Sequence, residues 1–223
     1  VVVKLVCTGY SLVPSDDGSL LVAEGGVAWD TLVDCAATHA LWGIENLAGI
    51  PGSAGGALVQ NIGAYGAELR DVFRCADVFD CVQGIVRRID SEEADLAYRT
   101  SLFKERRDLI VLSVTLALAQ DREPNLTYAD LARAHEAGVP LTSPREIAAA
   151  VRAVRAEKFP RTAGTAGSFF KNPVVDAEVL MSLRERYPDL PAYALADGRA
   201  RVLLAWILDR VLSLAGYAKG PVR

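Results

Sequence analysis

The sequence predicts a protein of the α+β class, with a mixed first part and a mostly helical second part that meet near residue 160. Three observations favour this prediction. Short β-like runs and turns fill the N-terminal region, a long apolar run covers 109–119, and a capped amphipathic segment covers 144–158. The chain has 223 residues, 51% of them hydrophobic, and a chain of this length buries roughly 70% of its unfolded surface.

Most strands are expected before residue 120. Within 1–27, the strand-like runs "VVVKLV" and "LLVAEGG" flank the turn signal "PSDDGS". Further strands are predicted in 72–90 and 108–118, and the apolar run "LIVLSVTLALA" is typical of a buried strand because it is too short to span a bilayer.

Four helices are expected along the chain. Asp30 is predicted to cap a helix over 31–41, whose apolar residues recur at helical spacing: Leu32, Cys35, Ala36 and His39. Ser143 and Glu146 form a capping box for a helix over 144–158, with Pro144 in the first helical position. After residue 160, Asp176 is expected to cap a helix over 177–187. A loop over 188–198 and a last helix over 201–216 follow.

Composition excludes several classes of function. The net charge of −4 argues against a general nucleic-acid surface. Four cysteines with no CxxC pair and only two histidines argue against a zinc site, so we expect no metal and four buried free thiols. We find no secretion signal and no membrane-spanning run, and we expect a cytoplasmic protein.

The segment 43–66 holds seven of the chain's 18 glycines. Glycine lets backbone N–H groups approach a phosphate, and Gln60 and Asn61 offer amide groups suited to the edge of a heteroaromatic ring. The segment carries neither a G-x-G-x-x-G fingerprint after a strand nor a Walker loop. From the residues alone, a cofactor-binding loop and an irregular connection are both open.

A second unusual segment is "AGTAGSFFKNPVV", residues 163–175. Its hydroxyl, Ser168, stands between Gly167 and two phenylalanines. A turn serine and a catalytic serine are both compatible with this setting.

Four stretches in this order, "ENLAGIPGSAGGALVQNIGAYG", "YRTSLFK", "LTYADL" and "AGSFFKNPVV", closely resemble the motifs of the UDP-N-acetylenolpyruvoylglucosamine reductase family. The resemblance runs over almost the whole chain, and "LTYADL" is similar to the family's type I branch, in which a tyrosine closes over the substrate. The resemblance implies the FAD-binding fold of the vanillyl-alcohol-oxidase type. Residues 1–159 would form its second lobe, and 160–223 an α+β substrate-binding domain.

The resemblance also implies a reaction. NADPH reduces FAD, and the reduced flavin gives hydride to UDP-N-acetylglucosamine enolpyruvate, which becomes UDP-N-acetylmuramate for peptidoglycan. Partners would be this UDP-sugar and NADPH, with no nucleic acid or membrane, and we expect a monomer.

Residue roles follow from the same resemblance. Ser168 would donate the proton, and Arg99 would hold the substrate carboxylate as charge builds on it. Lys158 would meet the diphosphate of the UDP-sugar, and Tyr128 would stack or hydrogen-bond near it. Asn172 would lie near the nucleotide and Ser168. In each case an ordinary structural role is the alternative, such as a helix-end lysine for Lys158.

The resemblance further implies a set of FAD contacts, and Glu24–Gly26 would approach the cofactor from the preceding strand. The expected contacts are Ile50, Pro51, Gly52, Gly55, Gly56, Gln60, Asn61 and Gly63.

Two pieces of the family pattern have no counterpart in this chain: a first FAD lobe, expected before Val1, and a final segment carrying a catalytic glutamate. Glu24, Glu45 and Glu178 belong to other motifs and do not replace that glutamate. We therefore expect this polypeptide by itself to bind FAD poorly and to turn over slowly or not at all. The alternatives are a non-catalytic remnant that binds a UDP-sugar or a protein partner, and another FAD oxidoreductase of the same fold.

Overall fold

The computed structural model describes residues 4–158, 170–195 and 197–214. The chain divides into two compact units, Val1–Ala163 and Gly164–Arg223, and each is described by itself. The assignment of 1–159 to an FAD lobe and of 160–223 to a substrate domain stays a prediction.

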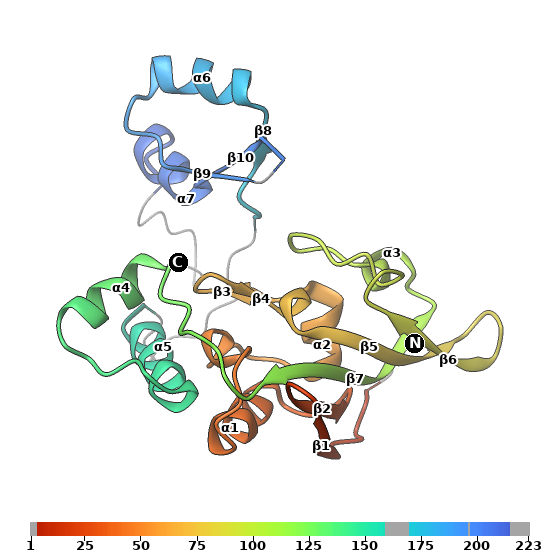
Figure 1. The fold of residues 1–223 in the computed structure, drawn as a ribbon. Coiled ribbons are helices and arrows are strands. Elements are labelled where there is room, and N and C mark those ends of the chain that lie inside the picture. Colours follow the sequence, from red (N-terminus) through yellow and green to blue (C-terminus); the bar gives the residue numbers. More distant parts are fainter. Residues whose placement is uncertain (1–3, 159–169, 196, 215–223) are drawn as a thin grey trace, which may run out of the picture. The chain divides into compact units, whose positions relative to one another are not determined.

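The first unit is built on a five-stranded antiparallel sheet in the order β1-β2-β7-β5-β6 (Figure 1). Its strands are β1 (Tyr10–Ser15), β2 (Gly18–Glu24), β5 (Phe73–Asp80), β6 (Ile85–Asp90) and β7 (Leu109–Ala119). The strands expected in 72–90 and 108–118 are therefore confirmed. Residues 4–6 of the expected first run form no strand.

The central strand β7 does not follow a simple alternation of buried residues. Val111 and Val114 are both buried, although they are three residues apart. The register shifts here: Asp77 pairs with Ser113 but Val78 pairs with Val111, so Leu112 is an extra residue. Such a bulge inverts the inward-facing positions on either side of it.

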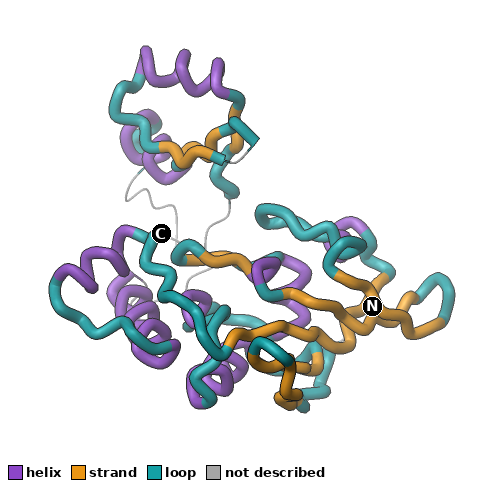
Figure 2. Tube along the Cα trace, viewed as in Figure 1, coloured by secondary structure: helices purple, strands orange, loops and turns teal. Residues whose placement is uncertain are grey.

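Helices of the first unit gather beside the sheet, with α4 and α5 at the opposite side of the unit from β6 (Figures 1 and 2). They are α1 (Trp29–Thr38), α2 (Ala54–Gln60), α3 (Leu102–Glu105), α4 (Ala129–Glu136) and α5 (Pro144–Lys158). Short 3-10 turns cover Glu45–Leu47 and Leu69–Asp71, and a small hairpin joins β3 (Gly63–Ala64) to β4 (Ala67–Glu68).

The start of α1 corrects the sequence prediction. Ala28 occupies the N-cap position and has no side-chain acceptor to cap the helix, while Asp30 lies inside the first turn. The buried stripe is Trp29, Leu32, Val33 and Ala36, and His39 is exposed at the end of the helix. The stripe is shifted because the bulky Trp29 packs inward and its indole Nε1 donates to the Leu47 carbonyl at 3.0 Å.

Helix α5 begins as the capping pattern predicted. The Glu146 N–H donates to Ser143 Oγ at 3.3 Å, and Ile147 and Val151 are fully buried. The Glu146 carboxylate accepts from the Thr142 N–H at 2.9 Å, one residue before the position expected for a capping box.

The second unit is more β-rich than its helical periodicity predicted. A three-stranded antiparallel sheet, β8-β10-β9, joins β8 (Val174–Val175), β9 (Ala192–Ala194) and β10 (Ala200–Val202). Strand β9 lies in the expected loop, and β10 replaces the start of the expected last helix. That helix is reduced to α7 (Leu204–Trp206) and a π-helical turn at Ile207–Val211. Helix α6 (Ala177–Arg186) begins after Asp176 as expected, but the Asp176 side chain accepts no hydrogen bond from the first turn of the helix.

Together the two units confirm the α+β class. The four cysteines are free, as expected, but none is buried: Cys7 and Cys81 are exposed and Cys35 and Cys75 are half-buried. Among the described residues, no helix is long and apolar enough to cross a bilayer.

Candidate functional site

The β3–β4 hairpin forms the centre of the candidate site. Its two-residue loop consists of Tyr65 and Gly66, whose φ angles are +48° and +85°. This geometry favours Asn-Gly, because a bulky side chain at positive φ costs roughly 1–2 kcal/mol. The Asn46 and Asn125 amides hold the loop by donating to the Tyr65 and Gly66 carbonyls at 2.7 and 3.0 Å. An aromatic residue in such a strained position points to a function for its side chain.

Two tyrosines and a lysine meet at the tip of this hairpin. The Tyr65 and Tyr128 rings are in edge contact, with centroids 4.9 Å apart. The Lys158 ammonium, at the end of α5, lies 5.9 and 5.6 Å from these two centroids. Asp130 at the start of α4 pairs with Lys158. We call Tyr65, Tyr128, Asp130 and Lys158 the tyrosine–lysine cluster.

Lys158 and Asp130 each stabilise the charged form of the other. The hydrogen bond that Lys158 donates to Asp130 raises the pKa of Lys158 and lowers the pKa of Asp130. Burial raises the pKa of Tyr65. The cluster therefore presents the Lys158 ammonium and tyrosine hydroxyls, donors suited to a phosphate, beside the Asp130 carboxylate that pairs with the lysine.

The expected carboxylate-binding residue, Arg99, lies in a tight turn. Ala97 and Thr100 exchange backbone hydrogen bonds of 3.1 and 3.0 Å, and Arg99 between them has φ +55°. Its guanidinium donates to the carbonyls of Asn61, at 3.4 Å, and of Gly63. Arg99 therefore contacts the base of the hairpin whose tip carries Tyr65.

The expected FAD-binding residues divide into two groups. Pro51, Gly52, Gly56 and Gln60 are exposed, while Ile50 and Gly63 are half-buried. Gly52 has φ +131° and a Cβ there would meet nothing within 4 Å. These residues form an open surface with little side-chain cover, which fits the close approach of a large cofactor.

Gly55 and Asn61 have structural roles. The Gly55 N–H donates to the Gly25 carbonyl at 2.9 Å, and a Cβ on Gly55 would lie 3.1 Å from that oxygen. Asn61 is fully buried with φ +41° and ends α2. Its amide donates to Ala97 and Glu68 and accepts from the Arg70 N–H. Its side chain is committed to these neighbours.

The loop before α2 is braced from two helices. Asp30 accepts from the Gly49 N–H at 2.7 Å, and Arg155 donates to the Gly49 carbonyl at 3.0 Å. Arg152 binds Asp30 through two nitrogens. Burial alone would raise the pKa of Asp30, but the bonds from Arg152 and Gly49 outweigh it and the pKa is lowered. The residue expected as a helix cap thus anchors the glycine-rich loop.

The backbone of the N-terminal residues 7–9 packs against the turn at Glu24–Gly26. Glu24 accepts from the Gly9 N–H through its carboxylate, and its own N–H donates to the Gly9 carbonyl at 2.9 Å. A Cβ on Gly26 would lie 2.6 Å from the Cys7 carbonyl. Chain packing therefore accounts for Gly26.

The remaining predicted residues belong to the second unit. Ser168 lies outside the described residues. Asn172 accepts from the Leu204 N–H at 3.0 Å through Oδ1. Phe170, in the same segment as Ser168, is 61% exposed.

Sequence reasoning missed Tyr65, and its signal was the "AYG" turn in the glycine-rich segment. Among the described residues, no group of histidine, cysteine or carboxylate side chains is arranged to hold a metal ion.

Comparison with known proteins matches the "FAD binding domain" family model to residues 1–90. The chain is 40% identical over 226 residues to UDP-N-acetylenolpyruvoylglucosamine reductase of Pseudomonas aeruginosa, with 99% of this chain and 66% of the relative covered. For the Pseudomonas fluorescens protein of the same name, identity is 38% over 215 residues, with coverage of 94% and 63%. The chain thus spans slightly less than two thirds of these relatives' length.

A solved structure supports the fold. The reductase of the same kind from Thermus caldophilus superposes with a TM-score of 0.50 at 24% identity, covering 88% of this chain and 68% of that one. The FAD-binding fold expected from the motifs is therefore confirmed. On the identity to its curated relatives, the chain belongs to the UDP-N-acetylenolpyruvoylglucosamine reductase family.

Proposed function

We propose that this protein reduces UDP-N-acetylglucosamine enolpyruvate to UDP-N-acetylmuramate, with FAD as cofactor and NADPH as reductant. The reaction would serve peptidoglycan synthesis, and with it cell shape and division, in the cytoplasm. The family's name and the "FAD binding domain" match support this activity. One observation carries the proposal. Arg99 contacts the base and Lys158 the tip of the same short hairpin, which puts two cations along one edge of the site.

The two cations suit the two anionic groups of this substrate. A guanidinium has five N–H donors in a planar fork, more than the Asn61 and Gly63 carbonyls use, and it meets a carboxylate through two oxygens. Lys158 is a compact point charge on a flexible side chain, a form suited to a diphosphate. Tyr65 and Tyr128 would add ring surface and hydroxyl donors beside it.

Reduction of the enolpyruvyl double bond adds a hydride to one carbon and a proton to the next. Bound FAD would supply the hydride chemistry. Pro51, Gly52, Gly56 and Gln60 would hold the cofactor through exposed backbone and one amide, since these positions lack covering side chains. Arg99 would stabilise the negative charge that builds on the carboxylate, an effect worth roughly 3–4 kcal/mol. We propose Ser168 as the proton donor and Asn172 as a nucleotide contact.

Calorimetry with UDP-N-acetylglucosamine and with its enolpyruvyl ether tests the binding roles separately. We expect Lys158→Met to weaken both ligands about tenfold, and Arg99→Met to remove only the extra affinity of the enolpyruvyl ether. Lys4→Met, an exposed lysine in the same unit, is the matched control. Equal affinity of the unaltered chain for both ligands would contradict the carboxylate role of Arg99.

Flavin binding separates the enzyme from its main alternative, a UDP-sugar binder without redox activity. That alternative also needs the tyrosine–lysine cluster but not the open surface at Gly52 and Gly56. The purified chain is titrated with FAD and then with NADPH while flavin absorbance is followed. Weak flavin binding is expected of this polypeptide by itself, whereas UDP-sugar binding with no flavin binding even at a large excess of FAD would favour the binder.

A further inference from the structure

We infer that Lys104 is a positioning residue for Arg99. The Lys104 ammonium donates to the Arg99 carbonyl oxygen at 2.8 Å, reaching back from α3 across five residues. This contact fixes the peptide plane that follows Arg99, and with it the direction in which the side chain leaves the backbone. The inference rests on the proposed function, in which the Arg99 guanidinium meets the substrate carboxylate.

The turn at Arg99 needs such a restraint because it is strained. At φ +55° an arginine occupies a conformation that L side chains rarely adopt, so a relaxed turn would place the guanidinium elsewhere. The contacts of the guanidinium with Asn61 and Gly63 hold only its far end. Lys104 holds the near end, at the backbone.

The base from which Lys104 reaches is itself fixed. Ser101, only 2% exposed, donates from Oγ to the Val59 carbonyl at 2.7 Å and ties the start of α3 to α2. The Leu102 N–H donates to the Ala94 carbonyl at 2.9 Å, and the Phe103 ring is buried in the core.

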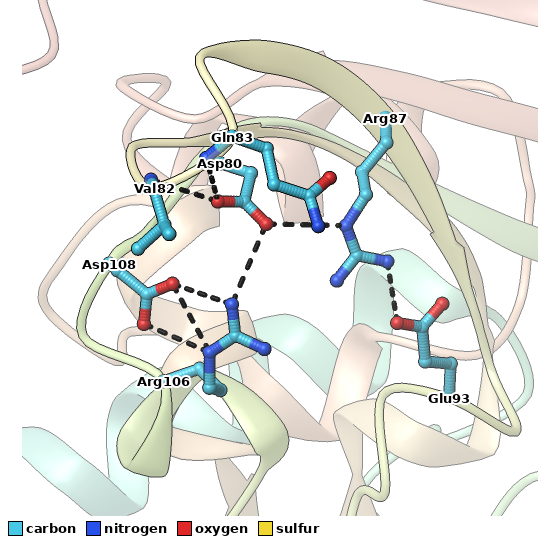
Figure 3. Close-up of polar contacts among 7 residues, drawn as sticks. All are labelled: Asp80, Val82, Gln83, Arg87, Glu93, Arg106 and Asp108. Carbon is cyan, nitrogen blue, oxygen red and sulfur yellow. Dashed lines mark hydrogen bonds and ion pairs between the residues drawn. The ribbon is translucent and has the colours of Figure 1, made fainter.

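The far end of α3 is held by an ion-pair network (Figure 3). Arg106 binds the Asp108 carboxylate through Nε and Nη2, and its Nη2 lies 3.5 Å from Oδ2 of the buried Asp80. Both ends of α3 are therefore anchored. Because the Lys104 backbone is held in place, its ammonium can restrain the Arg99 carbonyl.

Lys104→Met, Lys104→Arg and Arg107→Met form the test set. Arg107 is exposed in the same segment and controls for the loss of a positive charge. Hydrogen exchange of the Thr100 amide, which closes the turn, reports the restraint without any ligand. We expect Lys104→Met to speed this exchange about tenfold or more, Lys104→Arg to restore most of the protection, and Arg107→Met to change nothing. Unchanged exchange in Lys104→Met would overturn the inference.

The second readout is the affinity ratio between the enolpyruvyl UDP-sugar and UDP-N-acetylglucosamine. We expect Lys104→Met to lower this ratio about tenfold and to leave the affinity for UDP-N-acetylglucosamine unchanged. In an Arg99→Ala background the Lys104→Met effect on the ratio should vanish, because Lys104 acts through Arg99. A persisting effect would contradict the positioning role.

The two failures are distinguishable. If Arg99→Ala leaves the ratio unchanged, the proposed function of Arg99 is wrong, and the exchange of Thr100 alone decides the role of Lys104. If Arg99→Ala lowers the ratio and Lys104→Met does not, the inference about Lys104 is wrong and the proposed function stands.

Discussion

Replacing Asp80 by alanine tests how much a buried carboxylate contributes at the end of β5. Asp80 is fully buried, and its Oδ1 accepts from the Val82 and Gln83 N–H groups at 3.0 Å each. Its Oδ2 lies between Arg87 Nε, at 3.8 Å, and Arg106 Nη2, at 3.5 Å (Figure 3). Asp90, at the end of β6, makes the same two backbone contacts to Glu92 and Glu93 but is exposed. Comparing alanine variants of Asp80 and Asp90 therefore separates the contribution of burial to stability from that of turn geometry.

The magnitude follows from the hydrogen bonds. Two buried bonds to a charged acceptor are worth about 3 kcal/mol together, whereas water replaces much of the same bonding at Asp90, leaving about 1 kcal/mol. The ion pairs add little, because the Arg87 and Arg106 side chains are 26% and 43% exposed and solvent screens them. We therefore expect Asp80→Ala to cost about 3 kcal/mol and Asp90→Ala about 1 kcal/mol.

Urea denaturation followed by tryptophan fluorescence measures this difference, since Trp29 and Trp42 are both buried in the first unit. Asp80→Asn keeps an acceptor for the two N–H groups and removes the charge, so it should fall between the two alanine variants. Equal losses for Asp80→Ala and Asp90→Ala would refute the argument, because turn geometry alone would then account for the stability.

Three further predictions follow from other contacts. Gly66→Ala should destabilise more than Gly84→Ala in denaturant, because both positions have positive φ but a Cβ would meet Thr127 Oγ1 at 2.7 Å only at Gly66; equal losses would exclude the steric clash. Asp30→Asn should lower the free energy of unfolding more at neutral pH than at acid pH. The folded-state pKa of Asp30 is lowered, so its contribution is present above the unfolded value of about 3.9 and is lost as the pH falls through the folded value. Denaturation curves from pH 7 to 2.5 should converge at the acid end, and a constant gap would contradict the linkage. In an active holoenzyme, Ser168→Ala should spare flavin reduction by NADPH but slow reoxidation by the enolpyruvyl substrate, and stopped-flow traces equally slow in both halves would exclude Ser168 as proton donor.

Local chemistry made part of the fold predictable from sequence. The start of α5 was predicted because Ser143, Pro144 and Glu146 act within one turn of each other. The strand over 109–119 was predicted because its run of apolar residues is too continuous for an element exposed to water. Sequence motifs also identified the family, because the stretches around Arg99 and Ser168 are recognisable from residue order alone, without their three-dimensional contacts.

Only the tertiary structure decided which of these residues meet. It joins Tyr65 to Tyr128 and Lys158, turns Asp30 from an expected helix cap into an anchor for Gly49, and commits Asn61 to the chain itself. Each of these contacts joins segments far apart in the sequence. Periodicity and capping reach only three or four residues, whereas the register of the sheet and the strained turns that bring these groups together are fixed by packing of the whole unit.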